Sequence, residues 1–146
     1  MPSKRSAYVL TLPSDLRLLP LARTFIESIC QAMSFDRCFT DAVQLATHEG
    51  LRNIIRHAHE NCADALFEVQ AGPIDGGIEV RLLDEGKPFD IVTVPHLEPG
   101  ELRIGGRGVF LMRRLVDEIH SEPRRPCGNI LRLVKHVRPA IRRHLA

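Results

Sequence analysis

The sequence predicts an α/β (α+β) two-layer sandwich, with three helices on one face of a mixed, mostly antiparallel sheet. Two long segments near the N-terminus carry apolar residues at helical spacing. Two strand-like segments, 64–74 and 77–84, follow them, and the Asp-Gly in the short link "PIDGG" is typical of a tight hairpin. A glycine-rich stretch, a third helical pattern and a last apolar strand complete the domain.

The first expected elements are a strand at 7–13, "AYVLTLP", and two helices. Ser14 or Asp15 could cap the first helix, and Asp36 starts the second. The apolar positions of the first helix are Leu18, Leu19, Ala22, Phe25, Ile26, Ile29 and Met33. Those of the second helix are Ala42, Val43, Ala46, Ile54, Ile55 and Ala58.

The later elements follow the hairpin. The stretch "EGKPFD" breaks the second hairpin strand, and a proline-containing loop runs from Ile91 to Ile104. The glycine loop at 105–108 opens a helix, and "NILRLVKHV" at 129–137 is the last strand.

Length and composition point to one soluble domain. The 146 residues allow a single domain, 1–146, with a core at about 7–137 and a basic tail at 138–146. Contents of 44% hydrophobic and 26% charged residues are ordinary for a globular protein. No apolar run approaches the ~20 residues of a membrane span, and no signal-peptide core follows residues 1–5. A cytoplasmic protein without membrane contact is therefore expected.

The net charge of +2 implies no strong affinity for polyanions, but its distribution is uneven. After Glu122 no acidic residue occurs, and the basic residues that follow are Arg124, Arg125, Arg132, Lys135, Arg138, Arg142 and Arg143. This tail could touch nucleic acid or an acidic protein surface, although a solvated terminus is the favoured interpretation. Direct DNA binding is the weakest hypothesis, because no recognition motif accompanies the tail.

The four cysteines lie far apart and form no CxxC motif, so free thiols are expected. They are Cys30, Cys38, Cys62 and Cys127. The segment 57–62, "HAHENC", could supply metal ligands, but no second cluster completes a tetrahedral set. Solvated residues at the end of a helix are the favoured interpretation of this segment.

The second helix carries a polar stripe. Glu49, Asn53 and His57 follow one another at four-residue intervals, beside the apolar arc of Val43, Gly50 and Ile54. An ordinary helix boundary would explain the stripe as well as a cleft would. A glycine inside a helix costs ~1 kcal/mol relative to alanine, so Gly50 indicates a close approach to the helix backbone.

Two further patterns carry polar chemistry. Asp84 ends an apolar strand and Gly86 allows the chain to turn, so this carboxylate could accept a hydrogen bond from the amine of a base. A turn alone would give the same D-x-G pattern. The glycine loop at 105–108 leads into a helix N-terminus, where free N–H groups and the helix dipole favour an anion, with Arg107 as an additional cation.

In this order, the motifs resemble those of the GHKL, or Bergerat-fold, ATPases. The stretches "HEGLRNIIRHAH", "LLDEGKPFD", "GGRGVFLMRRLVDEI" and "GNILRLVK" are most similar to the small anti-sigma factor serine kinases of the RsbW type. The resemblance covers about residues 7–137. It implies a Bergerat ATP-binding fold, ATP and Mg²⁺ as cofactors, and a homodimer for which the first strand offers an edge or a face.

The resemblance also implies roles for individual residues. Asn53 would hold Mg²⁺, Glu49 would be the general base, and Asp84 would bind the adenine amino group, with Gly86 leaving room for the ring. The glycine loop would wrap the phosphates. The residues expected around the nucleotide, besides Asn53, are Arg56, His57, Asp84, Gly86, Gly105, Gly106, Arg107, Gly108, Val109 and Asn129.

Three features depart from the family pattern. Lys87 and Pro88 stand where many relatives have another glycine, so this part of the pocket is expected to be stiffer. The last strand begins Gly128-Asn129 instead of Gly-Thr, which puts the threonine's contact near the adenine in question. The loop from Ile91 to Ile104 is short for a lid.

The function that the resemblance implies is a Mg·ATP-dependent protein serine/threonine kinase in a partner-switching system that regulates transcription. Its partners would be a sigma factor, which it sequesters, and an anti-anti-sigma (STAS-type) antagonist, which it phosphorylates on a serine. One alternative is a nucleotide-responsive binding module without phosphoryl transfer. Another is a regulatory ATPase-like domain without any sigma factor. The sequence does not name the partner, the target serine or a stress signal.

Overall fold

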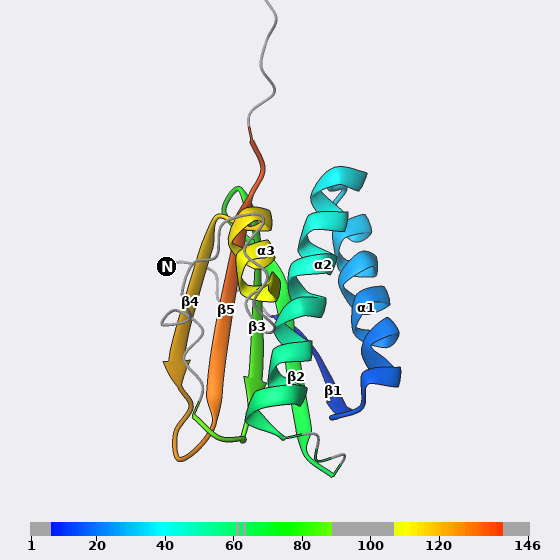
Figure 1. The fold of residues 1–146 in the computed structure, drawn as a ribbon. Helices are drawn as coiled ribbons and strands as arrows, with labels where there is room; N and C mark the ends of the chain where they lie inside the picture. Colours follow the sequence, from blue (N-terminus) through cyan, green and yellow to red (C-terminus); the bar gives the residue numbers. More distant parts are fainter. Residues whose placement is uncertain (1–6, 61, 63, 89–106, 139–146) are drawn as a thin grey trace, which may run out of the picture.

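The computed structural model describes residues 7–60, 62, 64–88 and 107–138. The chain forms one five-stranded sheet with the strand order β1-β2-β3-β5-β4 and a layer of helices over one face (Figure 1). The strands are β1 (Tyr8–Pro13), β2 (Leu66–Ile74), β3 (Gly77–Asp84), β4 (Glu118–Pro123) and β5 (Asn129–His136). The helices are η1 (Leu16–Leu18), α1 (Leu19–Ala32), α2 (Arg37–Asn53), η2 (Ile54–Ala58) and α3 (Arg107–Leu115).

The predicted fold class is confirmed, with one correction to the sheet. Each neighbouring pair of described strands is antiparallel, whereas the sequence interpretation expected a mixed sheet. β3 and β4 run in the same direction, but β5 lies between them and pairs antiparallel with both. β4 was not predicted at all, because an edge strand with one large aliphatic residue, Ile119, carries little apolar alternation.

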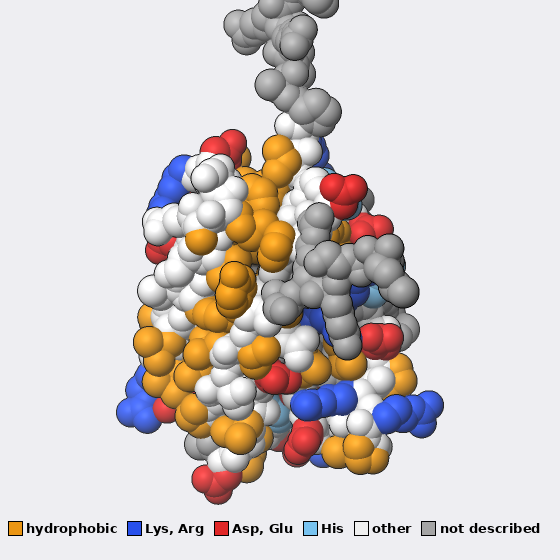
Figure 2. All heavy atoms as spheres, turned by 180° about the vertical axis from the view of Figure 1, so that it is seen from behind, with side chains coloured by type: hydrophobic (Ala, Val, Ile, Leu, Met, Phe, Trp, Pro, Cys, Tyr) orange, Lys and Arg blue, Asp and Glu red, His pale blue; other side chains and the backbone are white. Residues whose placement is uncertain are grey.

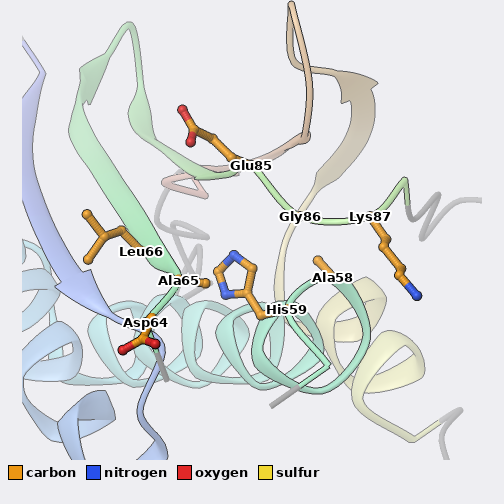
Figure 3. Close-up of a pocket in the computed structure, with 8 residues that line it drawn as sticks. All are labelled: Ala58, His59, Asp64, Ala65, Leu66, Glu85, Gly86 and Lys87. Carbon is orange, nitrogen blue, oxygen red and sulfur yellow. The ribbon is translucent and has the colours of Figure 1, made fainter. Parts of the chain in front are cut away.

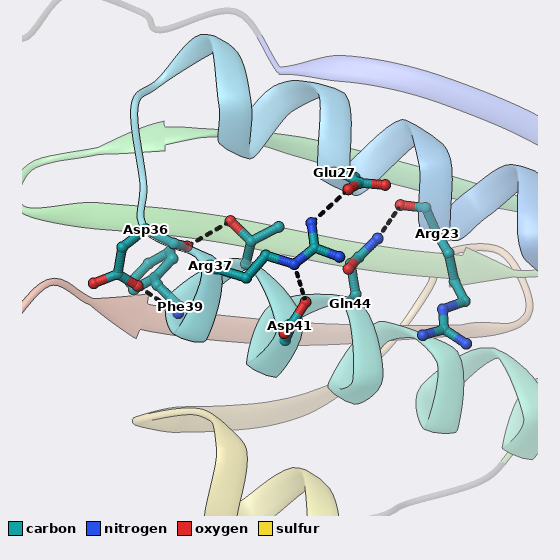
Figure 4. A network of polar contacts seen from close by, with 8 residues as sticks. Arg23, Glu27, Asp36, Arg37, Phe39, Asp41 and Gln44 are labelled. Carbon is teal, nitrogen blue, oxygen red and sulfur yellow. Dashed lines mark hydrogen bonds and ion pairs between the residues drawn. The ribbon is translucent and has the colours of Figure 1, made fainter.

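The two N-terminal helices form an antiparallel pair whose ends match the sequence signals. Asp36 caps α2, since its Oδ1 accepts a hydrogen bond from the backbone N of Phe39 at 2.8 Å. Asp15 caps the short 3₁₀ turn η1 that precedes α1. Between the helices, Gln44 Nε2 donates to the carbonyl of Arg23 at 2.9 Å (Figure 4). This buried amide joins α2 to α1.

The hydrophobic core lies between the helices and the sheet. α1 packs over β2, α2 over β3 and β5, and α3 beside β4. The close approach predicted at Gly50 is real: a Cβ there would lie 2.6 Å from Leu82 Cδ1 and 3.3 Å from Leu131 Cδ2. Glycine at this position therefore lets α2 sit close to the centre of the sheet.

The opposite face of the sheet carries no described helix, and Figure 2 shows hydrophobic and charged side chains mixed on it. The strand register places one row across the five strands, made of Val9, Gln70, Arg81, Arg132 and His120. The guanidinium of Arg132 pairs with Glu79 at 2.6 Å. No helix in the described part of the chain is long and apolar enough to cross a membrane.

Candidate functional site

Asp84, the last residue of β3, is a buried carboxylate with one fixed and one unpaired oxygen. Its Oδ1 accepts hydrogen bonds from the backbone N of Gly86 at 2.8 Å and from Asn129 Nδ2 at 2.9 Å. Its Oδ2 is buried and has no hydrogen-bond partner among the residues that the structure describes. Since buried polar atoms are nearly always hydrogen-bonded, this orphaned acceptor indicates a place for a donor from beyond the described residues, such as a water molecule or a ligand.

The unpaired oxygen belongs to a residue that lines a small cavity between α2 and the ends of the strands. The cavity measures about 20 Å³ and has room for roughly one water molecule. Its lining residues are Gly50, Asn53, Ile54, Ala58, Asp84, Ser121, Asn129 and Leu131. Three residues expected from the sequence are thus brought together here: Asn53, Asp84 and Asn129. An adenine ring needs more space, so binding it requires the cavity to widen.

Asn53, the last residue of α2, adds a second orphaned polar group to this cavity. Its side-chain Nδ2 is buried and has no hydrogen-bond partner within the described ranges. A half-turn of the amide exchanges nitrogen and oxygen, so the same place can present the oxygen that a hard cation prefers. Among the described residues, no group of three or more His, Cys, Asp or Glu side chains could hold a metal ion.

Glu49 lies one turn before Asn53 and faces the start of α3. A Cβ on Gly108 would lie 2.7 Å from Glu49 Oε2, so the glycine lets the carboxylate approach the first turn of α3. The free N–H groups of a helix N-terminus favour a negative charge there. Arg52 Nη1 is 3.6 Å from the other oxygen, Oε1. The structure therefore brings together two motifs that are far apart in the sequence.

Some expected residues do not reach this cavity. Arg56 and His57 are exposed on η2, a π-helical turn in which His59 N donates to the carbonyl of Ile54. The prediction that Glu49, Asn53 and His57 form one stripe depended on an α-helix that continues through Ala58. The wider π turn changes the direction of the side chains that follow Asn53. Val109 is buried in the hydrophobic core.

The glycine of the D-x-G turn has backbone atoms close around it. Gly86 packs against the helix end, because a Cβ there would lie 2.3 Å from the carbonyl oxygen of Ala58. The position of that missing Cβ is therefore filled by backbone, not left open. Gly105 and Gly106 lie outside the described residues, as does the loop from Ile91 to Ile104, and nothing is described of the side chain of Arg107.

His59 is the polar residue that sequence reasoning missed. It was expected to be solvated, but it is buried, and its Nδ1 lies 2.8 Å from Ser14 Oγ. Burial lowers the pKa of His59, and the charge of Asp84 opposes this shift. The signal that could have found it is its spacing, four residues after the buried Ile55.

A larger pocket of about 650 Å³ lies beside His59 (Figure 3). It is lined by Ala58, His59, Asp64, Ala65, Leu66, Glu85, Gly86 and Lys87. Ala58 also lines the small cavity at Asp84, so the two share a wall. Of the expected residues that the structure describes, Gly86 lines the larger pocket, whereas Asp84, Asn53 and Asn129 do not.

The fold and the polar cavity define a two-layer α/β domain in which a buried carboxylate at a strand end faces a long helix. The chain belongs to the family of histidine kinase-like ATPase domains, whose model matches residues 12–135. This match confirms the resemblance of the motifs to those of the GHKL ATPases.

Curated relatives and a solved structure agree with this family. The chain is 28% identical over 127 residues to "Serine-protein kinase RsbW" of Listeria innocua, covering 82% of this chain and 81% of that protein. It is 22% identical over 118 residues to the protein of the same name from Bacillus subtilis, and the match covers 75% of this chain and 74% of that protein. The structure of the RsbU and RsbW domains of Rv1364c from Mycobacterium tuberculosis matches 92% of this chain with a TM-score of 0.63 at 16% identity. The match spans 33% of that longer chain.

Proposed function

We propose that this protein is a Mg·ATP-dependent protein serine kinase that acts as an anti-sigma factor in a partner-switching system. It phosphorylates a serine of a STAS-type anti-anti-sigma antagonist and sequesters a sigma factor. The relatives named serine-protein kinase RsbW support this class of activity. The observation that carries nucleotide binding is the buried, unpaired Oδ2 of Asp84.

Asp84 suits the recognition of adenine. An ionised carboxylate only accepts hydrogen bonds, and the exocyclic amine of adenine only donates them. Oδ1 is already occupied by Gly86 and Asn129, so Oδ2 is the atom that receives the amine. The cavity beside Gly50 and Leu131 supplies apolar walls for the ring once it widens.

Asn53 and Glu49 are the residues proposed for metal binding and for proton transfer. Asn53 would hold Mg²⁺ through its side-chain oxygen, and the bound ion would neutralise charge on the phosphates. Bound Mg·ATP supplies the phosphoryl group that is transferred. Glu49 accepts the proton of the attacking serine hydroxyl, and its position against the first turn of α3 places it beside the end of the glycine loop. The rest of the catalysis is positioning and charge neutralisation.

The experiment measures phosphoryl transfer from radiolabelled ATP to a STAS-type antagonist protein. Glu49→Gln keeps the size of the side chain but removes the base, so transfer should fall by about 10²–10⁴ while ATP affinity is retained. Asn53→Ala should lose both transfer and tight binding of Mg·ATP. Glu118→Gln, an exposed glutamate on β4, is the matched control and should behave as the wild type.

Two results would change the assignment. Transfer at the wild-type rate by Glu49→Gln would mean that the base lies elsewhere or that none is needed. Wild-type protein that binds nucleotide and partner but transfers no phosphate to any antagonist would favour the binding module.

A further inference from the structure

We propose that Asn129 is the positioning residue that aims Asp84 at the nucleotide base and thereby sets a preference for 6-aminopurines over 6-oxopurines. This inference rests on the proposed function, because it assumes that the cavity at Asp84 receives the base. Asn129 is buried at the start of β5, directly opposite Asp84 in the strand register.

The side-chain nitrogen of Asn129 donates hydrogen bonds to two acceptors. Nδ2 donates to Asp84 Oδ1 at 2.9 Å and to the carbonyl oxygen of Lys87 at 2.7 Å. The orientation of the amide follows from its surroundings, because the oxygen in this place would face a carboxylate and a carbonyl, which are both acceptors. Both hydrogens of the nitrogen are therefore used inside the chain.

These bonds decide which oxygen of Asp84 remains for a ligand. Oδ1 receives two donors, Gly86 N and Asn129 Nδ2, and the carboxylate cannot rotate without losing both. Oδ2 is left as an acceptor with no partner in the described part of the chain. A fixed acceptor pairs with the amine of a 6-aminopurine and repels the carbonyl oxygen of a 6-oxopurine.

The residue before Asn129 makes this reach possible. Gly128 has φ +102°, and a Cβ there would lie 1.9 Å from the carbonyl oxygen of Asp84. Only glycine allows β5 to begin so close to the end of β3. A threonine at 129 has a single O–H donor, so it could bond either the carboxylate of Asp84 or the carbonyl oxygen of Lys87. The amide of asparagine has two N–H donors and bonds both.

The second bond of Asn129 ties the carboxylate to the helix end. Lys87, whose carbonyl accepts from Asn129, donates its own N–H to the carbonyl of Ala58 at 2.9 Å. Ala58 is the last residue of η2 and lines the cavity at Asp84. Asn129 on β5 therefore fixes the turn at 84–87, and this turn is itself bonded to the end of η2 in the helical layer.

The test compares ATP with inosine triphosphate, which carries a carbonyl oxygen in place of the amine, by titration calorimetry on the full chain. Asn129→Leu keeps the volume and removes the hydrogen bonds, and it should lower the ratio of ATP affinity to inosine triphosphate affinity on the order of tenfold. Asn129→Thr, which retains one donor, should give an intermediate ratio. Gln44→Ala is the matched control, since it removes a buried amide bound to a carbonyl outside the site, and its ratio should equal that of the wild type.

A double-mutant comparison separates positioning from a structural role. If Asn129 acts through Asp84, Asn129→Leu should change ATP affinity by less than about twofold in an Asp84→Asn background. Additive effects, or an unchanged ratio in folded Asn129→Leu, would overturn the inference while leaving ATP binding intact. If Asn129→Leu does not fold, an unchanged ratio in Asn129→Thr overturns it. Wild-type protein that binds no ATP would overturn the proposed function itself.

Discussion

Gly86→Ala tests why a glycine follows Asp84. In the structure a Cβ on Gly86 would lie 2.3 Å from the carbonyl oxygen of Ala58, 2.6 Å from its carbonyl carbon and 2.9 Å from its Cβ. Backbone atoms cannot move aside as a flexible side chain can, so the turn must separate from the end of η2. The separation breaks the bond from Lys87 N to the same carbonyl oxygen.

The magnitude follows from two terms. The lost hydrogen bond costs about 0.5–1.5 kcal/mol, and the overpacking costs about 1–3 kcal/mol. Gly86→Ala should therefore lower the free energy of unfolding by about 1.5–4.5 kcal/mol, measured by urea denaturation followed by circular dichroism. Gly76→Ala is the control: apart from its neighbours in the chain, no atom lies within 4 Å of the position of its Cβ, and only the strain of φ +74° is added, at a cost of about 1 kcal/mol.

The outcome separates two explanations of the D-x-G motif. If glycine is needed only to leave room for the adenine ring, Gly86→Ala should remain as stable as the wild type and lose ATP affinity alone. Stability within about 0.5 kcal/mol of the wild type would refute the explanation by packing against Ala58.

Three further predictions concern the nucleotide, the pH dependence of stability and assembly. Asp84→Asn should stay folded and weaken ATP binding by about 1–3 kcal/mol in calorimetry, because a donor replaces the acceptor at Oδ2; unchanged affinity would contradict the assignment. The folded-state pKa of His59 lies below the ordinary histidine value of 6.5 because the ring is buried, so the unfolded chain binds the proton more readily and stability should fall as the pH drops through that value. Urea denaturation at about pH 7.5 and about pH 5.5 should show a smaller fall in His59→Gln than in His120→Gln, an exposed control, and equal falls would count against it. Among the described strands β1 pairs only with β2, so we expect a homodimer that uses this strand; light scattering from a monomer at high micromolar concentration, with and without nucleotide, would argue against it.

Local signals were sufficient for most of the described elements. Asp36 caps α2 as predicted, because capping depends on a side chain and the backbone three residues away. The hairpin between β2 and β3 turns at Asp75 and Gly76, where φ of +74° requires the permissive residue that the sequence supplies. The motifs around Asn53 and Asp84 were also readable, and the structure places both side chains in one cavity.

Features that depend on contacts between distant segments were not readable. β4 carries little apolar alternation of its own, and its strand geometry comes from pairing with β5. The π turn at η2 cannot be recognised from hydrophobic spacing, because that pattern assumes the constant angle per residue of an α-helix. The turn moves His57 out of line with Glu49 and Asn53.

The sequence by itself determined the family of the protein, the order of its described helices and the described strands other than β4. It also determined the polar groups from which a nucleotide site can be built. These properties follow from the spacing of apolar, polar and glycine residues along the chain, because local backbone geometry relates that spacing directly to helices, strands and turns. Only the tertiary structure decided that Gly86 contacts Ala58 and that the amide of Asn129 holds Asp84. Asp84 and Asn129 are separated by 45 positions in the chain. Their contact exists because β3 and β5 pair in one register, and that register is fixed by the packing of the whole sheet against its helices.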